Sequence, residues 1–284
     1  MQVARGAFIF GTCRNGGMSV SCVLRNTSRG DGGQMNDEVP TMYVGISIYQ
    51  SGQLVFENLN YGEISSNGYL LVNESDFALG PSGFDEFLLV AICSRETSDE
   101  AKYFPQEHQV KYRNDKSKKI CTVLYDQIPV PISGKTNPAI VIMAPKVWIG
   151  QDTNTFLLFN GLASSSHLTT DQALELFVFS SDGKVIAKTN ILKTVNATNS
   201  IDLRDVLERS GVKIDSQGKY YTVFGRGGAA TYSILTILKN EKSGNLATEH
   251  TLSPHYYMSG DRALMRNDVI AFKGWNEVVG ENYN

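Results

Sequence analysis

The chain has 284 residues and a formal net charge of −3, and it is 42% hydrophobic and 19% charged. Its length corresponds to one large domain or to two of about 140 residues each. The charge gives no electrostatic reason to approach nucleic acid or an anionic membrane, and no apolar run nears the roughly 20 residues that would span a bilayer. Without a signal-peptide core at the N-terminus, we expect a protein that is cytoplasmic or part of an assembled particle.

Short segments rich in β-branched and aromatic residues predict strands throughout the first half of the chain. They are MSVSCVLRN (18–26), GISIYQSGQLVFEN (45–58) with a Ser-x-Gly turn at its centre, and FDEFLLVAICSR (84–95). Around Ile46 and Ile48 apolar and small residues alternate, which is the period of a strand with one solvated face. Residues 73–79 predict a helical turn or two at most.

All four cysteines, Cys13, Cys22, Cys93 and Cys121, lie in the first half of the chain. No pair has the C-x-x-C spacing of a zinc ribbon or a thioredoxin-like motif. Cys13 and Cys22 flank a turn sequence, so they form a cross-strand disulfide if the register places them opposite each other. The other interpretation, which the frequency of buried free thiols favours, is two small apolar residues in strands.

A linker and a second set of strands follow. Residues 126–138 (DQIPVPISGKTNP) combine three prolines with turn dipeptides, which is a linker composition. The later strands are predicted in TNTFLLFNG (153–161), ELFVFSSDGKVIAKT (175–189) and KYYTVFGRGGAATYSILTIL (219–238). Residues 201–209 predict a short helix, because Leu203, Val206 and Leu207 share one face and Gly211 follows as a stop.

The predicted strands of the two halves resemble one another in the same order. Matched anchors are Asn26 with Asn160, Gly52 with Gly183, and the dipeptide at Glu107-His108 with the one at Glu249-His250. Slowly drifting offsets are what a duplication followed by loop insertions and deletions produces. We therefore expect an all-β protein of two tandem antiparallel β-sandwich modules related by internal duplication, each with a short helical crossover. The expected modules are 1–126 and 139–258, joined by a linker at 127–138 and followed by an extension at 259–284.

The repeated Glu-His dipeptides are the most notable polar candidates for a site. Beside the second dipeptide lie His255, Tyr256 and Tyr257, and a metal interpretation would take His250, His255 and one carboxylate as zinc or manganese ligands. Neighbouring residues of a strand point to opposite faces, which separates Glu249 from His250, and the odd spacing separates His250 from His255. We therefore expect no metal and no cofactor, and the remaining alternatives are a structural histidine or a polar-ligand site.

Aromatic side chains at strand ends are candidates for sugar recognition, because a flat ring stacks on the apolar face of a pyranose. Trp148, Tyr256 and Tyr257 are such residues, although each also suits a place in the core. The candidate ligand-binding set is Glu107, His108, Glu249, His250, His255, Tyr256, Tyr257 and Trp148.

Nothing in the sequence forms a recognisable catalytic motif. There is no G-x-S-x-G nucleophile elbow, and nothing local supports a Ser-His-Asp or Cys-His arrangement among the four histidines. A hydrolase would require acids from both modules, such as Glu107 and Glu249, to meet in one cleft.

Part of the second half resembles the sensory rhodopsin transducer family of small β-sandwich proteins. The resemblance is carried by the apolar strand ending in Asn at 157–160, by the strand and Ser-Asp turn of ELFVFSSDG (175–183), and by TVNATNSIDLRDVL (194–207). The first half departs further from this pattern, since it has a glycine-rich insertion between Asn26 and Pro40. The resemblance implies a sandwich that oligomerises and binds sugars or a partner protein.

We therefore expect a non-catalytic binding protein that acts through β-sandwich surfaces on a carbohydrate or a protein partner, including self-association. The first alternative is a structural subunit of a larger assembly such as a virion, appendage or filament. The second is a hydrolase on a β-sandwich scaffold. Partners among nucleic acids and insertion into a membrane are not expected.

Overall fold

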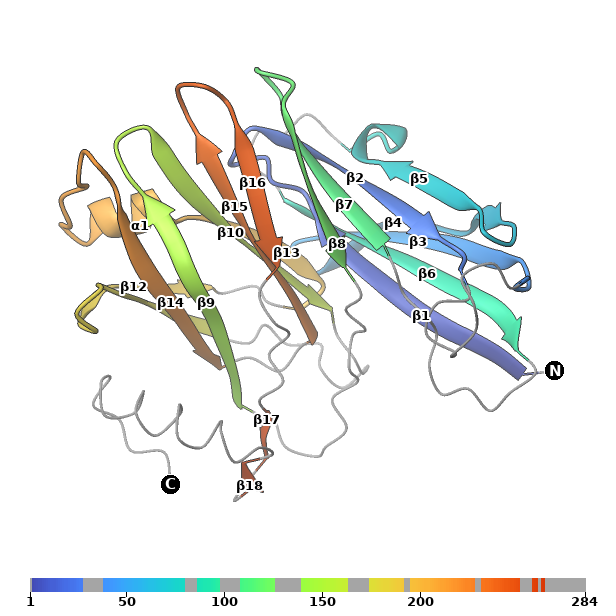
Figure 1. The fold of residues 1–284 in the computed structure, drawn as a ribbon. Coiled ribbons are helices and arrows are strands. Elements are labelled where there is room, and N and C mark those ends of the chain that lie inside the picture. The colour runs from blue at the N-terminus through green and yellow to red at the C-terminus, as the bar shows by residue number, and fades with distance from the viewer. Residues whose placement is uncertain are drawn as a thin grey trace.

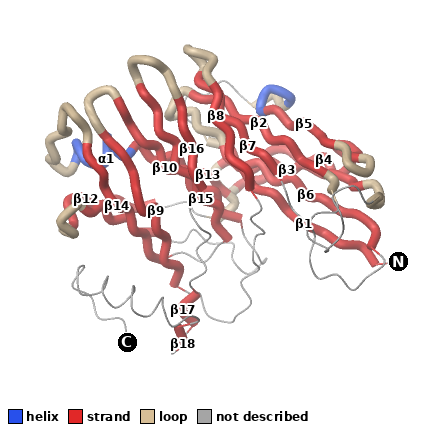
Figure 2. The backbone as a smooth tube through the Cα atoms, viewed as in Figure 1, coloured by secondary structure: helices blue, strands red, loops and turns tan. Residues whose placement is uncertain are grey.

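The computed structural model describes residues 2–27, 38–79, 86–97, 108–125, 139–162, 174–191, 195–227, 231–250, 257–259 and 262–263. Strands make up most of these residues, so the expected all-β class is confirmed (Figure 2). The predicted linker and most of the predicted C-terminal extension lie outside the described residues. Within them, no helix is long and apolar enough to cross a membrane.

The first half of the chain folds into two antiparallel sheets that face each other (Figure 1). One sheet has the order β1-β6-β3-β4 and the other β5-β2-β7-β8. The elements are β1 (Gln2–Gly11), β2 (Met18–Arg25), β3 (Met42–Gln50), β4 (Gln53–Ile64), β5 (Tyr69–Asn73), the 3₁₀ turn η1 (Glu74–Asp76), β6 (Phe87–Thr97), β7 (His108–Asn114) and β8 (Ile120–Tyr125).

The second half forms another pair of sheets, with the orders β12-β11-β14-β9-β17-β18 and β13-β10-β15-β16. Its strands are β9 (Ala139–Ile149), β10 (Thr153–Leu162), β11 (Leu174–Phe179), β12 (Val185–Ile191), β13 (Ala197–Asp202), β14 (Lys219–Gly227), β15 (Thr231–Asn240), β16 (Leu246–His250), β17 (Tyr257–Ser259) and β18 (Arg262–Ala263). The helix α1 (Leu203–Arg209) follows β13 at the place that η1 takes after β5.

The strand order of β1–β8 is repeated strand for strand by β9–β16. Local details repeat as well: Asn73 and Asp202 occupy the N-cap positions of η1 and α1. The turns that contain Gly52 and Gly183 both place the glycine at positive φ. This agreement is what an internal duplication predicts, and the duplication itself stays a prediction.

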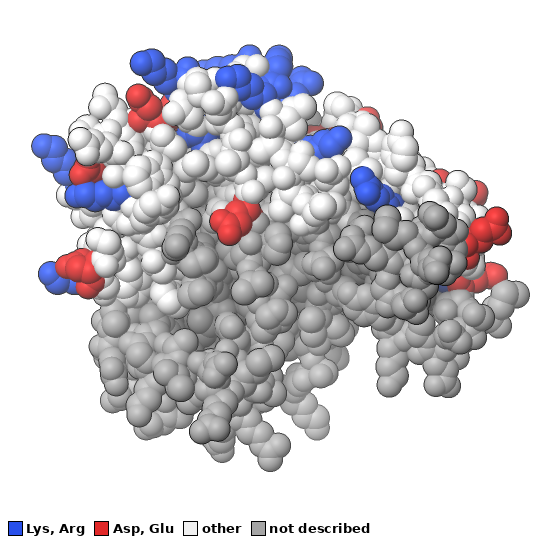
Figure 3. Space-filling model, in the orientation of Figure 1, with Lys and Arg blue, Asp and Glu red and all other residues white. Residues whose placement is uncertain are grey.

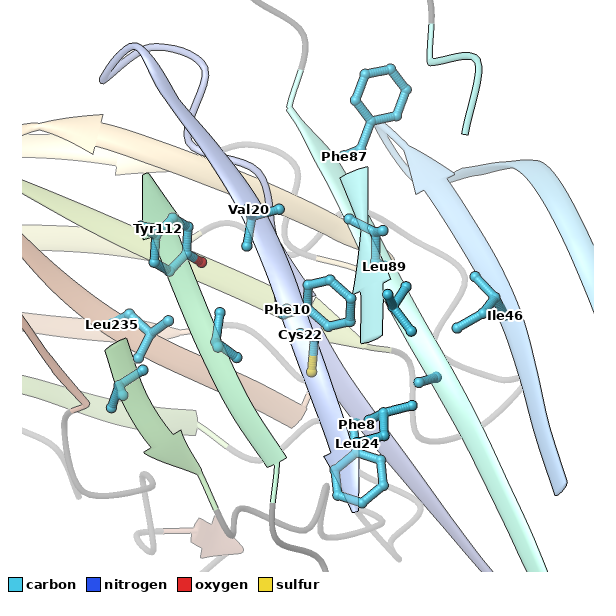
Figure 4. Close-up of a cluster of buried hydrophobic side chains, with 14 of the residues drawn as sticks. Phe8, Phe10, Val20, Cys22, Leu24, Ile46, Phe87, Leu89, Tyr112 and Leu235 are labelled. Carbon is cyan, nitrogen blue, oxygen red and sulfur yellow. The ribbon is translucent and has the colours of Figure 1, made fainter. Parts of the chain in front are cut away.

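The hydrophobic core of the first half is completed by side chains of the second half. It is formed mainly by alternate residues of β1, β2, β3, β6 and β7, and it also contains Phe156 and Leu158 from β10 and Leu235 and Ile237 from β15. Figure 4 shows Leu235 beside Tyr112 at the margin of this cluster. The sheet of β13-β10-β15-β16 therefore closes the open side of the first sandwich, where β10 lies near β1 and β16 lies beside β8 (Figure 1).

The other face of the same sheet packs on the second core. Leu157, Phe159 and Ile234 meet residues of β9, β11 and β14, together with the apolar face of α1. That face consists of Leu203, Val206 and Leu207, as the spacing predicted. Because β10 is covered on both faces, its residues from Asn154 to Gly161 are all buried.

Polar contacts fix the two halves together around this interface. Within the first half, the Tyr112 hydroxyl donates to the carbonyl of Gly11 at 2.9 Å. A Cβ at Gly11 would lie 2.1 Å from Asn160 Oδ1 of the second half, so only glycine fits where β1 approaches β10. The Glu86 carboxylate accepts bonds from the Thr12 hydroxyl at 2.6 Å and from the Ser200 hydroxyl of the second half. The halves therefore share both a core and its polar margin.

The four cysteines are buried and carry no disulfide. The backbone of Cys13 bridges to Met18, and Cys22 lies farther along β2, so the register does not place the two thiols opposite each other. Burial raises the pKa of all four thiols, and it raises the pKa of Cys121 to about 11.

Replacement of Leu235 by alanine should lower the free energy of unfolding of the whole chain by about 2–5 kcal/mol, because it opens a cavity between the halves. Urea unfolding followed by circular dichroism checks this, and both halves should unfold in one transition. Leu54→Ala, at a residue that is 49% exposed, is the matched control and should shift stability by roughly 0.5 kcal/mol or less. Two separated transitions in the unmodified protein would contradict a shared core.

The thiols should not react with a disulfide reagent at pH 8 while the protein is folded, since the thiolate is the reactive form and burial disfavours it. Titration with Ellman's reagent should show four reactive thiols in guanidinium chloride and only slow reaction without it. Prompt stoichiometric reaction in the native state would show that the thiols are accessible.

Candidate functional site

A pocket of about 450 Å³ lies at one side of the second sandwich. Its walls come from β9 and β14 of one sheet and from β10, β15 and β16 of the other. The shared strand order makes β9 the counterpart of β1 and β16 the counterpart of β8. The second half covers the side of the first sandwich where β1 and β8 lie, and the pocket lies at the equivalent side of the second sandwich. The lining residues are Trp148, Thr155, Tyr220, Thr236, Leu238, Ala247, Thr248 and Glu249.

Two aromatic rings form one wall of the pocket. Trp148 and Tyr220 are cross-strand partners of β9 and β14, and their ring centroids lie 4.5 Å apart in an edge-to-face arrangement. Tyr220 is 58% exposed, so one side of this pair is available to solvent. Gly218 supports the indole from behind, because a Cβ there would lie 2.7 Å from the indole carbons.

The opposite wall is polar at its margin and apolar at its centre. Glu249 of β16 is exposed, and it is paired in register with Thr236 of β15, whose hydroxyl donates to the Glu249 carbonyl at 3.2 Å. Leu238 and Ala247 form the next register pair on the same face of the sheet and supply apolar surface. The Glu249 carboxylate therefore stands at the rim of a partly apolar pocket.

Hydrogen bonds between the two sheets hold the walls at a fixed separation. The hydroxyl of the buried Thr155 in β10 donates to the carbonyl of Trp148 in β9 at 2.7 Å. Arg204 from α1 donates to the carbonyls of Gly150 and Thr153, which flank the turn between these strands. Trp148 thus lies near the end of β9, beside a turn that these hydrogen bonds hold in place, and the pocket is formed without a ligand.

The structure brings together two residues of the predicted set, Trp148 and Glu249. His108 is elsewhere: it is buried in the first core, with its ring centroid 4.5 Å from that of Phe8. The backbone of His250 is paired with Leu235, and its side chain lies outside the described residues. Glu107, His255 and Tyr256 lie outside the described residues, as does the side chain of Tyr257.

The two Glu-His dipeptides do not occupy equivalent places in the fold. His108 begins β7, whose counterpart in the second half is β15, whereas His250 ends β16, the counterpart of β8. The structurally matched hairpins are instead at NDKSKKI (114–120) and NEKSGNL (240–246), which share the same turn. In each, the side-chain oxygen of the first asparagine accepts backbone N–H bonds from the turn.

Sequence reasoning missed Tyr220 and the three threonines of the pocket. The doublet Tyr220-Tyr221 reads as ordinary strand composition, and only the pairing of β14 with β9 puts Tyr220 beside Trp148 while Tyr221 is buried in the second core. Thr236 interrupts the apolar run ILTIL (234–238), and that interruption was the one available signal.

The described residues contain no group of three or more His, Cys, Asp or Glu side chains that could hold a metal ion. Within the described lining of the pocket, Glu249 is the single carboxylate. Its surroundings suit hydrogen bonding to hydroxyl groups.

No family model and no curated protein matches the chain. Among solved structures, a calcium-binding mutant of Bacteroides uniformis beta-glucuronidase 2 is similar over 90% of this chain, with 9% identity and a TM-score of 0.19. A glycosyl hydrolase family 2 member from Bacteroides cellulosilyticus is similar over 87%, with 12% identity and a TM-score of 0.17. The present chain spans about a quarter of those two chains, 26% and 28% respectively.

A serine-rich repeat protein from Streptococcus agalactiae is similar over 92% of this chain and 88% of its own, with 10% identity and a TM-score of 0.20. Scores this low carry no argument about activity or ligand. The function must therefore be argued from the residues of this chain.

Replacement of Gly218 by alanine should displace the Trp148 ring, because Gly218 has a φ of +84° and its new Cβ would overlap the indole. We expect a loss of about 1–3 kcal/mol in unfolding free energy and a shifted tryptophan emission maximum. Gly183→Ala is the matched control: its φ is +79°, but a Cβ there meets nothing within 4 Å. An unchanged emission spectrum in Gly218→Ala would contradict the placement of the indole.

Proposed function

We propose that the protein is a non-catalytic binding protein that holds a neutral carbohydrate in the pocket beside Trp148. The observation that carries this proposal is the pair of the half-buried Trp148 and the exposed Tyr220, in a pocket that has the Glu249 carboxylate at its rim. An aromatic face takes the apolar side of a sugar ring, and a carboxylate accepts hydrogen bonds from its hydroxyl groups.

The size and build of the pocket support the same proposal. Small-molecule sites are mostly preformed cavities of about 300–1,000 Å³, lined by apolar groups with a few placed polar ones. The pocket falls within that range, and its walls are fastened by the Thr155 bond to Trp148. The apolar centre at Leu238 and Ala247 suits the C–H surface of a sugar better than it suits an ion.

Binding is favoured over hydrolysis by the count of acids at the site. Glycosidases use two carboxyl groups that flank the scissile bond. Glu249 stands alone among the described lining residues, and the described acid Glu86 is engaged with Thr12 and Ser200 at the junction of the halves. A binding role needs one carboxylate and an aromatic platform, both of which are present.

Tryptophan fluorescence can test the proposal, since the chain has two tryptophans, Trp148 and Trp275. In a Trp275→Phe background, titration with glucose, galactose, N-acetylglucosamine and their trisaccharides should produce a saturable change in Trp148 emission. Adding Glu249→Gln should weaken the binding of the best sugar about tenfold, or roughly 1.4 kcal/mol, by removing a hydrogen bond to a charged acceptor.

Two control variants separate the pocket from general surface effects. Tyr220→Ala should weaken sugar binding, whereas Tyr69→Ala, at a tyrosine that is 73% exposed on β5 of the first half, should leave it unchanged. Isothermal titration calorimetry of the same variants should give the same order of affinities. If all the sugars fail to bind, or if Tyr69→Ala and Tyr220→Ala behave alike, the pocket is not a carbohydrate site.

A further inference from the structure

The edge strand β4 carries a surface that the pocket does not involve. Its residues from Gln53 to Asn60 are all exposed, including Leu54, Val55, Phe56 and Leu59, and Leu59 is 61% exposed. Large apolar groups gathered on an exposed edge mark an interaction site. We call the exposed edge formed by Leu54, Val55, Phe56, Glu57, Leu59 and Glu63 the acidic face. It takes in both sides of the strand, because Phe56 is paired with Ile48 and contacts Phe77, whereas Glu57 is paired with Ser47 on the other side.

The charge of this region has a single sign. Between residues 41 and 94 the sequence contains no lysine or arginine, but it contains Glu57, Glu63, Glu74 and Asp76 among the described acids. Glu74 is paired with Arg14 at 3.1 Å, so the exposed carboxylates are those of Glu57, Glu63 and Asp76. A partner that covers the apolar residues must therefore carry positive charge beside them.

The backbone of β4 favours docking through side chains over addition of another strand. Its ladder with β3 is interrupted at Val55 and again between Asn58 and Gly62. At the second interruption the two backbones are close, since a Cβ added to Gly45 would lie 3.1 Å from the backbone of Leu59. Bulges of this kind protect an edge from pairing. The apolar side chains remain exposed despite that protection.

The two halves differ at this place. In the second half, α1 packs against β12 and β13 and buries Ala187 and Ile191. In the first half, the single turn η1 stands where α1 would be. Its contacts with β4 include the Phe77 ring, 5.2 Å between centroids from that of Phe56, and the Asp76 carboxylate, which accepts a bond from the Tyr61 hydroxyl at 3.3 Å. The cover that the fold supplies to β12 is thus largely missing from β4.

A surface of opposite charge lies on the hairpin of β7 and β8. It consists of Arg113, Lys116, Lys118 and Lys119 with the exposed Ile120 and Leu124, and we call it the basic edge. Figure 3 shows lysine and arginine side chains gathered along the upper margin of the molecule, where Figure 1 places the hairpin tips. Ile120 and Leu124 are each 57% exposed, so this surface also combines charge with apolar groups.

The basic edge is held rigid by the second half. Asn114 Nδ2 and the Ser117 hydroxyl both donate to the carbonyl of Gly244, at 3.3 and 3.0 Å. Lys119 Nζ donates to Asn245 Oδ1 at 2.7 Å. Docking of this hairpin therefore requires little ordering, which favours association.

We propose that the acidic face of one copy of this chain binds the basic edge of a second copy. Each surface supplies what the other needs: exposed aliphatic groups to bury together, and charges of opposite sign around them. The two surfaces are different parts of the molecule, so the contact is heterologous, and each copy keeps one of each surface free. Such a contact builds linear chains or closed rings.

Light scattering after size exclusion tests the proposal over a range of protein concentrations. The weight-average mass of the full chain should rise from 31.3 kDa with concentration. It should fall when salt is raised from about 50 mM to about 500 mM, because screening weakens contacts between exposed charges. A mass of 31.3 kDa at every concentration and at low salt would overturn the proposal.

Charge-reversal variants identify the surfaces. Glu57→Lys with Glu63→Lys removes the acidic face, and Lys116→Glu with Lys118→Glu removes the basic edge. Each double variant alone should be monomeric, with the dissociation constant raised by about a hundredfold or more by like charges. An equimolar mixture of the two should associate again, because the intact basic edge of one variant meets the intact acidic face of the other, and the two reversed surfaces also carry charges of opposite sign.

Two further measurements separate this contact from other causes. Lys184→Glu with Lys213→Glu makes the same charge change at exposed lysines outside the basic edge and should associate like the unmodified protein. Circular dichroism and urea midpoints show whether each variant is folded, and Leu59→Ser provides an uncharged disruption of the acidic face. Growth that persists in both double variants, or a mixture that fails to form dimers, would show that other surfaces drive association.

Discussion

The apolar face of the sheet β13-β10-β15-β16 determines the rest of this architecture. Phe156, Leu158, Leu235 and Ile237 complete the first core, and the reverse of the same strands forms the second core. One sheet thus serves two cores, and burial of its second face supplies a hydrophobic driving force that two independent sandwiches would lack. The glycine at position 11 and the Glu86 contacts are consequences of this close approach.

The same arrangement explains why the halves, although alike in strand order, cannot exchange roles. In the register of the first half, Ser21, Gln109 and Lys111 take the places that Phe156, Leu235 and Ile237 take in the second. These three polar side chains lie on the outer face of the β5-β2-β7-β8 sheet, so that face lacks most of the apolar surface with which its counterpart closes the first sandwich. At the corresponding side of the second sandwich, the described residues form the pocket.

Period-two patterns and turn residues were enough to predict the strands, the short helix at Leu203–Arg209 and the two-sandwich class, because these depend on local alternation and caps. The pocket depends on long-range register. Trp148 could be proposed from its chemistry, but its neighbour Tyr220 follows only from the pairing of β9 with β14. Aligning the two halves on the Glu-His dipeptides was wrong, because the dipeptides are identical but lie on strands that are not equivalent. The hairpins that begin at Asn114 and Asn240 are less alike in sequence, yet they are the equivalent segments. His108 shows the same limit, since burial against Phe8 leaves no trace in the sequence around it.

Net charge was a poor guide to the surface for a related reason. A total of −3 gives no electrostatic reason to approach nucleic acid or an anionic membrane, but it does not describe how the charges are arranged. The acids of β4 and the cations of the β7–β8 hairpin are separated in both sequence and space. Opposite charges that are segregated cancel in the sum, while each patch keeps its own field within about one Debye length. For a protein whose apolar residues also gather at those patches, the distribution of charge decides what it can meet, and the total says little.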